Sequence, residues 1–270
     1  MRNHGIALVS AITLLVVVTS CSKKFEVFSF VHCTDTQIGF MDHSEGFTHS
    51  DSLFNAAIVA VNALAPEVVV ITGDLVDNID DPIQNSIFEK RVAEFDPPVY
   101  LLPGNHDYKK QWTEQIRDDY VALRGYDRFS FKKKGCAFIG IDTNCIKEKA
   151  EEAEAEQLSW LEGELRKARK ANYTFLFLHC PIFKKDIAEA DDYENFPIEK
   201  REKYISLLKE YGVDAVLAGH THKDIDIEYQ GIRLVAANPV CEALGHGRPG
   251  FNVVKVGKEG FEIEFHPTTD

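Results

Sequence analysis

Short apolar runs alternate along this chain with longer segments in which apolar residues recur at helical spacing. Runs rich in Val, Ile and Phe predict strands, and they lie at residues 25–34, 67–72, 99–102, 129–132, 136–142, 173–178 and 214–218. Helical spacing predicts helices over residues 51–65, 82–95, 109–123 and 199–211. Residues 148–170 predict a further helix with a solvated charged face, because acidic side chains at its start and basic ones at its end complement the helix dipole.

The fold class follows from how the strands are patterned. Residues 68–71 and 175–178 are continuously apolar, which is typical of strands buried on both faces with helices outside. From Asp224 onward the pattern alternates instead, and it predicts antiparallel strands at 225–229, 232–236, 251–256 and 261–265. We expect these late strands to form a second sheet packed on the first. The predicted fold is α/β, with two packed mixed β-sheets flanked by helices in an αββα sandwich.

Residues 1–20 differ from the rest of the chain. Arg2 is their only charged side chain, and Ile6 to Val18 is almost unbroken apolar sequence, which is short for a membrane span of about 20 residues. The run ends at Val18-Thr19-Ser20-Cys21, which resembles the lipobox of bacterial lipoproteins and implies that Cys21 is lipidated. An ordinary cleaved signal peptide and a cytoplasmic start with an apolar first strand are the alternatives.

This resemblance predicts three segments: a lipoprotein signal peptide at 1–20, a lipid anchor and short tether at 21–24, and one globular domain at 25–270. The expected location is the bacterial cell envelope, anchored to a membrane and facing the periplasm or the exterior. With 44% hydrophobic and 27% charged residues in 270, the chain is long and apolar enough for one large core. The net charge of −13 becomes −14 when Arg2 is removed, which argues against nucleic-acid binding as a main role.

Five cysteines follow Cys21, in a compartment where disulfides are allowed. Cys136 and Cys145 bracket a predicted strand that would separate them by about 30 Å, too far for a bond. Cys33 and Cys180 each lie beside a candidate metal ligand, and neighbouring strands would bring them close. No CxxC spacing is present, so a thiolate zinc site or redox motif has no support. We expect mostly buried free thiols.

Chemistry-bearing residues follow five of the predicted strands. In such folds the site lies at the carboxyl ends of the strands, so we expect these residues to meet. They are Asp35 and Gln37, Asp74 and Asp77, Asn105 and His106, His179, and His220 and His222. Two divalent ions about 3.5–4 Å apart need one bridging carboxylate and several further O and N ligands, and Asp74 is the best candidate for the bridge.

The order of these motifs resembles the calcineurin-like metallophosphoesterase superfamily, over essentially the whole chain after the signal segment. The motifs are Asp35-x-Gln37, Gly73-Asp74-x-x-Asp77, Gly104-Asn105-His106-Asp107, His179 and Gly219-His220-Thr221-His222. Three further stretches are similar to the calcineurin-like phosphoesterase domain-containing protein 1 group, namely residues 35–41, Asp191-Asp192-Tyr193, and Leu244-Gly245 with Arg248. Residues 25–270 are accordingly expected to form a metallophosphoesterase domain.

The resemblance implies two divalent metal ions, Mn, Fe or Zn. It implies that the first ion is held by Asp35, Asp74, His222 and the Gln37 position, and the second by Asp74, Asn105, His179 and His220. Gln37 departs from the family, which usually has His there. An amide oxygen is harder than imidazole and favours Mn-like character; the alternative is that Gln37 binds no metal.

The resemblance also implies phosphate ester hydrolysis by metal-bound hydroxide, with His106 as general acid and Asp77 orienting it. Arg248 and Asn105 are candidates for binding the phosphate, although Arg248 is equally interpretable as a surface residue. Three functions compete: a membrane-tethered phosphomonoesterase, a phosphodiesterase or pyrophosphatase on the same site, and a non-catalytic binding lipoprotein.

Overall fold

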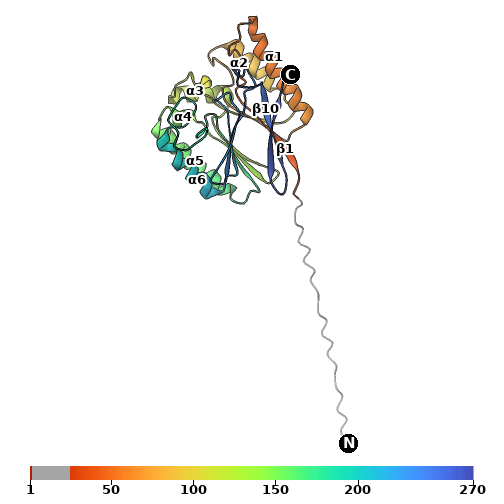
Figure 1. The fold of residues 1–270 in the computed structure, drawn as a ribbon, viewed down its shortest axis with the longest axis vertical. Coiled ribbons are helices and arrows are strands. Elements are labelled where there is room, and N and C mark those ends of the chain that lie inside the picture. Colours follow the sequence, from red (N-terminus) through yellow and green to blue (C-terminus); the bar gives the residue numbers. More distant parts are fainter. Residues whose placement is uncertain (2–24, 270) are drawn as a thin grey trace.

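Two β-sheets pack face to face in the computed structural model, which describes Met1 and residues 25–269 (Figure 1). The first sheet has the order β11 (Phe261–Pro267), β10 (Gly250–Val256), β1 (Phe28–Cys33), β2 (Val69–Thr72), β3 (Val99–Leu102). The second has the order β4 (Phe129–Lys133), β5 (Cys136–Gly140), β6 (Thr174–Phe177), β7 (Ala215–Ala218), β9 (Ile232–Ala236), β8 (Ile225–Tyr229). The predicted signal peptide and Cys21 lie outside the described residues.

Helices cover both outer faces of the sheet pair. The first sheet is covered by α1 (Thr48–Leu64), α2 (Pro82–Val92) and α3 (Glu114–Arg124), and the second by α4 (Asn144–Lys147), α5 (Glu151–Ala168) and α6 (Ile198–Tyr211). Figure 1 shows α1 and α2 on the opposite side of the sheets from α5 and α6. The predicted αββα sandwich is confirmed. None of the helices formed by the described residues has the length and apolar character needed to cross a membrane.

Strand β1 shows why the sheets adhere. Its period-2 alternation places Phe30 between the sheets and Val31 beneath the helices. The ring of Phe30 meets those of Phe138 and Phe175 edge to face, with centroids 5.0 and 4.9 Å apart. Such aromatic pairs add about 0.5–1.5 kcal/mol each beyond the area they bury. The sheets are therefore joined by an aromatic core that reaches across from β1 to β5 and β6.

The expectation that all four late strands form the second sheet is wrong. Strands β8 and β9 extend the second sheet, where β9 runs parallel to β7, but β10 and β11 extend the first. Strand β10 pairs antiparallel with β1, opposing Phe28 to Val256. Local alternation identifies a strand but does not identify its neighbour, because pairing partners are chosen by the rest of the chain.

The helix predicted from residue 109 begins instead at Glu114. Lys109 and Lys110 have φ angles of 56° and 57°, in the left-handed region, and such residues do not continue a right-handed helix. The side chain of Thr113 then caps α3 by accepting a hydrogen bond from the Ile116 backbone N–H. The two lysines thus belong to the turn that follows β3.

The five cysteines among the described residues are buried free thiols, as predicted: Cys33, Cys136, Cys145, Cys180 and Cys241.

Candidate active site

The candidate residues meet where parallel strands of both sheets end. Strands β1, β2 and β3 run parallel in one sheet, and β6 and β7 run parallel in the other. Two hydrogen bonds tie the two sets of loops together: His179 Nδ1 contacts the Thr72 carbonyl oxygen at 2.7 Å, and the His220 backbone N–H donates to the Asp35 carboxylate at 2.9 Å. Seven candidate metal-binding positions are therefore placed on one edge of the sandwich.

Backbone strain is concentrated at these positions. Asp35, Gln37, Asp74, His220 and His222 all have positive φ angles, between 37° and 70°. A residue with a side chain in this region costs about 1–3 kcal/mol, and such residues cluster where function requires the geometry. The loops are held in these conformations by the surrounding fold.

Two glycines allow the loops to approach each other closely. A Cβ at Gly104 would overlap the backbone nitrogen and carboxylate of Asp74, and a Cβ at Gly219 would overlap the Thr34 hydroxyl and the Asp35 carboxylate. Neither glycine requires a positive φ angle. Both positions require glycine because a larger residue would not fit, and not because of backbone flexibility.

One group of potential ligands surrounds Asp74. Single ligand atoms of Asp74, His179 and His220 all lie within 4.8 Å of one another. His179 Nε2 is 3.4 Å from Asp74 Oδ2 and 3.1 Å from Asn105 Oδ1. All three side chains of the group are buried. The spacing of these oxygen and nitrogen atoms fits a divalent cation between them.

A second group surrounds Asp35. Its Oδ1 is 3.5 Å from His222 Nε2, and this buried oxygen has no hydrogen-bond partner among the described residues. Buried carboxylate oxygens are normally satisfied, so the orphaned atom fits a cation ligand. Gln37 is buried nearby, and its Oε1 accepts a hydrogen bond from the Cys241 thiol at 3.5 Å.

In each of the three histidines, a backbone carbonyl determines which ring nitrogen carries the proton. A carbonyl only accepts, so the nitrogen that faces it must carry the proton, and in the neutral ring the other nitrogen keeps its lone pair. The contacts are His179 Nδ1 with Thr72 O at 2.7 Å, His220 Nε2 with Tyr193 O at 2.9 Å, and His222 Nδ1 with Glu242 O at 3.1 Å. The nitrogens without a backbone carbonyl partner are Nε2 of His179, Nδ1 of His220 and Nε2 of His222, and the two Nε2 atoms lie beside Asp74 and Asp35.

The electrostatics of the site favour positive charge. Burial raises the pKa of Asp74, but the charge of His179 and its hydrogen bond outweigh burial and bring the Asp74 pKa below its usual range. Burial lowers the pKa of His179, and the Asp74 charge outweighs this and raises it to about 9. Burial and the nearby His179 lower the pKa of His220 to about 4. Burial also lowers the pKa of His222, but Asp35 outweighs burial and raises it. Two buried carboxylates, Asp35 and Asp74, thus face one neutral and two readily protonated imidazoles.

His106 lies beside the ligand group and is bound differently. Its Nδ1 is 2.9 Å from the Asp77 backbone oxygen and 3.0 Å from the Asp77 carboxylate. Burial lowers the pKa of His106, but the hydrogen bond to Asp77 outweighs it and raises the pKa. His106 also lines an open cavity of about 200 Å³ together with Asp77, Asn78, Asp80, Lys109 and Lys110.

Tyr193 was missed as a site residue, although it belongs to the Asp191-Asp192-Tyr193 motif of the resemblance. Its hydroxyl accepts a hydrogen bond from Asn105 Nδ2 at 2.7 Å, and its ring centroid lies 4.6 Å from that of His220. Tyr193 comes from an irregular loop between β6 and α6, where no periodicity reveals which side chains turn inward.

Asp107 was also missed. Its buried carboxylate accepts hydrogen bonds from the backbone N–H groups of Gly104 and Leu75. Burial raises the pKa of Asp107 to about 7. Asp107 therefore braces the turn that presents Asn105 and His106.

Arg248 is the one candidate that the described contacts do not join to the site. It is exposed, and its guanidinium donates to the Thr269 carbonyl oxygen at 3.4 Å. Its role at the phosphate stays a prediction.

Two packed mixed sheets with this ligand set at their joined strand ends define a metallophosphoesterase. The chain belongs to the calcineurin-like phosphoesterase family, whose model matches residues 28–224. It is therefore a phosphoesterase that acts on a phosphate ester with the help of divalent metal ions.

Among curated proteins, the chain is 27% identical over 253 residues to serine/threonine-protein phosphatase CPPED1 of Rattus norvegicus, covering 86% of this chain and 81% of that protein. It is 30% identical over 217 residues to probable glycerophosphodiester phosphodiesterase GpdQ of Arcobacter nitrofigilis, covering 77% of each. Among solved structures, a dimetal phosphatase from Danio rerio has the same fold, with a TM-score of 0.70 at 15% identity over 90% of this chain and 97% of that one.

Proposed function

We propose that this protein hydrolyses phosphate monoesters at a dinuclear metal centre with two half-sites that share Asp74. The first half-site comprises Asp35, Gln37, Asp74 and His222, and the second comprises Asp74, Asn105, His179 and His220. The main support is the arrangement of three buried histidines whose carbonyl contacts leave one ring nitrogen each beside the buried carboxylates. The unpaired Oδ1 of Asp35 is a further ligand atom without another partner.

The reaction we propose divides the work between the ions and the chain. Two divalent ions, when bound, would lower the pKa of a water towards about 7 and draw charge from the phosphoryl group. His106 would donate a proton from Nε2 to the leaving alkoxide, because its Nδ1 is already occupied by Asp77. The cavity of about 200 Å³ that His106 lines has room for a small leaving alcohol.

The relatives support two substrate classes. The match to the CPPED1 phosphatase covers 86% of this chain and supports a monoester, whereas the match to GpdQ covers 77% and supports the alternative of a phosphodiester. A pyrophosphatase on the same site is a further alternative. A non-catalytic binding lipoprotein is the weakest candidate. The proposed ligand set matches that of the family except at position 37, where this chain has Gln and the family usually has His.

The metals and the location are part of the proposal. An amide oxygen at Gln37 favours Mn over Zn in the first half-site, and Fe is a further candidate. Gln37 Oε1 accepts one weak hydrogen bond from the Cys241 thiol, which leaves its second lone pair for ligation. Lipidation at Cys21 would anchor the enzyme in the cell envelope, with its domain facing the periplasm or the exterior.

One experiment tests the function directly. Residues 21–270 are purified, stripped of metal and reloaded with Mn, Fe or Zn, and metal content is measured beside phosphate release from phosphoserine, sugar phosphates, nucleotides, phospholipid headgroups, p-nitrophenyl phosphate and its bis ester. We expect two ions per chain and faster turnover of monoesters. Preference for the bis ester would favour the diesterase, and two-metal protein without turnover would favour the binding lipoprotein.

A further inference from the structure

The loop of residues 181–197, here called the strap, connects the end of β6 to α6 and passes over the second half-site. Arg201 of α6 is hydrogen-bonded to several backbone carbonyls of the strap. This arginine is 0% exposed, and its guanidinium donates to the carbonyl oxygens of Phe196, Ile187 and Glu189 at 2.9, 3.0 and 2.6 Å. It also lies 3.3 Å from the Asp191 carboxylate. A buried cation with this many partners fixes the path of the loop.

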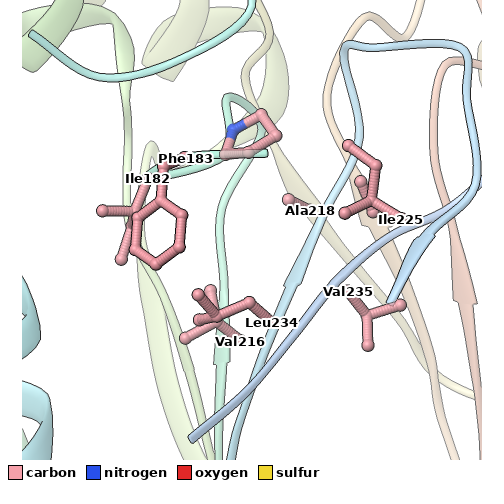
Figure 2. Close-up of a pocket in the computed structure, with 9 residues that line it drawn as sticks. Ile182, Phe183, Val216, Ala218, Ile225, Leu234 and Val235 are labelled. Atoms are coloured by element: carbon pink, nitrogen blue, oxygen red, sulfur yellow. The ribbon is translucent and has the colours of Figure 1, made fainter. Parts of the chain in front are cut away.

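The first residues of the strap are anchored as well. Ile182 and Phe183 pack against side chains of β7, β8 and β9, around an apolar cavity of only about 10 Å³ (Figure 2). The ring of Phe183 meets that of Tyr229 edge to face, with centroids 5.2 Å apart. The strap is therefore packed at its root and clamped by Arg201 near its end.

The middle of the strap is where it meets the site. Tyr193 uses its backbone oxygen for His220 Nε2 and its hydroxyl for Asn105 Nδ2. The other amide atom of Asn105, Oδ1, lies 3.1 Å from His179 Nε2. Tyr193 is nevertheless 59% exposed, so the phenol lies at the open side of the half-site.

The hydroxyl of Tyr193 has an unused proton. A phenol can accept and donate one hydrogen bond each. Here it accepts from Asn105, and among the described residues no acceptor takes its own proton. An open-facing donor beside a potential metal ligand is suited to an oxyanion.

We propose that Tyr193 is a substrate-binding residue that donates this hydrogen bond to a phosphoryl oxygen and selects monoesters over diesters. The inference rests on the proposed function and names a determinant of its specificity. A phosphomonoester has three non-bridging oxygens and a diester has two. The third oxygen of the monoester carries additional negative charge. A hydrogen-bond donor placed against it therefore favours monoesters over diesters.

The test compares Tyr193→Phe with the unaltered protein, both loaded with metal. A hydrogen bond to a charged acceptor is strong, so we expect kcat/KM on p-nitrophenyl phosphate to fall about tenfold and on the bis ester to fall less than about twofold. Calorimetry should show inorganic phosphate binding about tenfold more weakly. Metal content should stay at the value of the unaltered protein.

Tyr173→Phe is the matched control. It removes a phenolic hydroxyl that donates to the Lys258 carbonyl oxygen at 3.3 Å, at the opposite end of β6, and we expect no change in any of these measurements. Equal losses on both esters, unchanged phosphate affinity, or loss of a bound ion in Tyr193→Phe would each overturn the proposal. If the unaltered protein binds two ions but neither cleaves esters nor binds phosphate, the proposed function fails first, and this inference fails with it.

Discussion

His106→Asn separates proton donation from metal binding. An alkyl alkoxide is a poor leaving group and needs the proton that His106 would supply, whereas p-nitrophenolate leaves without one. General acid catalysis typically contributes about 10²–10⁴-fold, so we expect a loss of that size on phosphoserine or a sugar phosphate and a loss below about tenfold on p-nitrophenyl phosphate. Metal content should be retained, because His106 is bound to Asp77 and lies outside both ligand groups.

Asp77→Asn should give a milder form of the same result. The Asp77 backbone oxygen lies 2.9 Å from His106 Nδ1 and is not removed by this substitution, so we expect the ring to keep its tautomer and to lose only the charged carboxylate at 3.0 Å. Removing such a supporting partner costs about 10–100-fold, and we expect the lower end of that range on alkyl esters.

The pH dependence follows from the same contact. Asp77 raises the pKa of His106, and the acid must be protonated to act. The rate on alkyl esters therefore falls as pH rises past this pKa, and Asp77→Asn should move the fall to lower pH. The assay is a pH profile of kcat for one alkyl and one nitrophenyl ester with each protein. Equal losses on both esters with metal retained would refute the general acid, and loss of an ion would mean that the turn is assigned wrongly.

The remaining predictions concern the metals, the packing and the anchor. Asp74→Asn should lower metal content and abolish turnover, because it removes the charge shared by both half-sites. Gln37→His should raise Zn affinity relative to Mn in competition assays, as imidazole replaces an amide oxygen. Gly104→Ala should lower the unfolding temperature by overpacking against Asp74, a cost of about 1–3 kcal/mol. Cys21→Ala should release the protein from membrane pellets or leave its precursor unprocessed.

Each of these four has a clear contrary result. Two ions and full activity in Asp74→Asn would remove the bridge from the proposal. An unchanged Zn to Mn preference in Gln37→His would place that side chain outside the ligand set. Unaltered stability in Gly104→Ala would mean that the turn relaxes easily, and tight anchoring with correct processing in Cys21→Ala would exclude lipidation there.

The fold was largely predictable because its signals are local. Continuous apolar strands such as β2 and β6, and helical spacing in the segments between them, specify a layered α/β architecture without any knowledge of contacts. The membership of β10 in the first sheet was not predictable, since it depends on pairing with β1 more than 200 residues earlier. Period-2 alternation is the same for any neighbour.

The site also has parts that the sequence predicts and parts that it does not. Ligand residue types at strand ends identify a metal centre, but the contacts of the Tyr193 hydroxyl and of the Arg201 guanidinium with the loop do not follow from local spacing. One signal for Arg201 exists in the sequence: it lies on the buried stripe of α6 with Tyr204, Ile205 and Leu208. An arginine on the apolar face of a helix indicates buried polar partners.

The wide separation of the tied loops also sets the order of events in folding. The backbone N–H groups of Val240 and Cys241 donate to the carbonyls of Thr34 and Asp35, and His220 holds Asp35 across 185 positions of sequence. A nascent chain that ends before these residues cannot close the first half-site, so no fragment emerging during synthesis has a complete place for the ions. The proposed centre could therefore take up its full complement of metal only after most of the fold is formed.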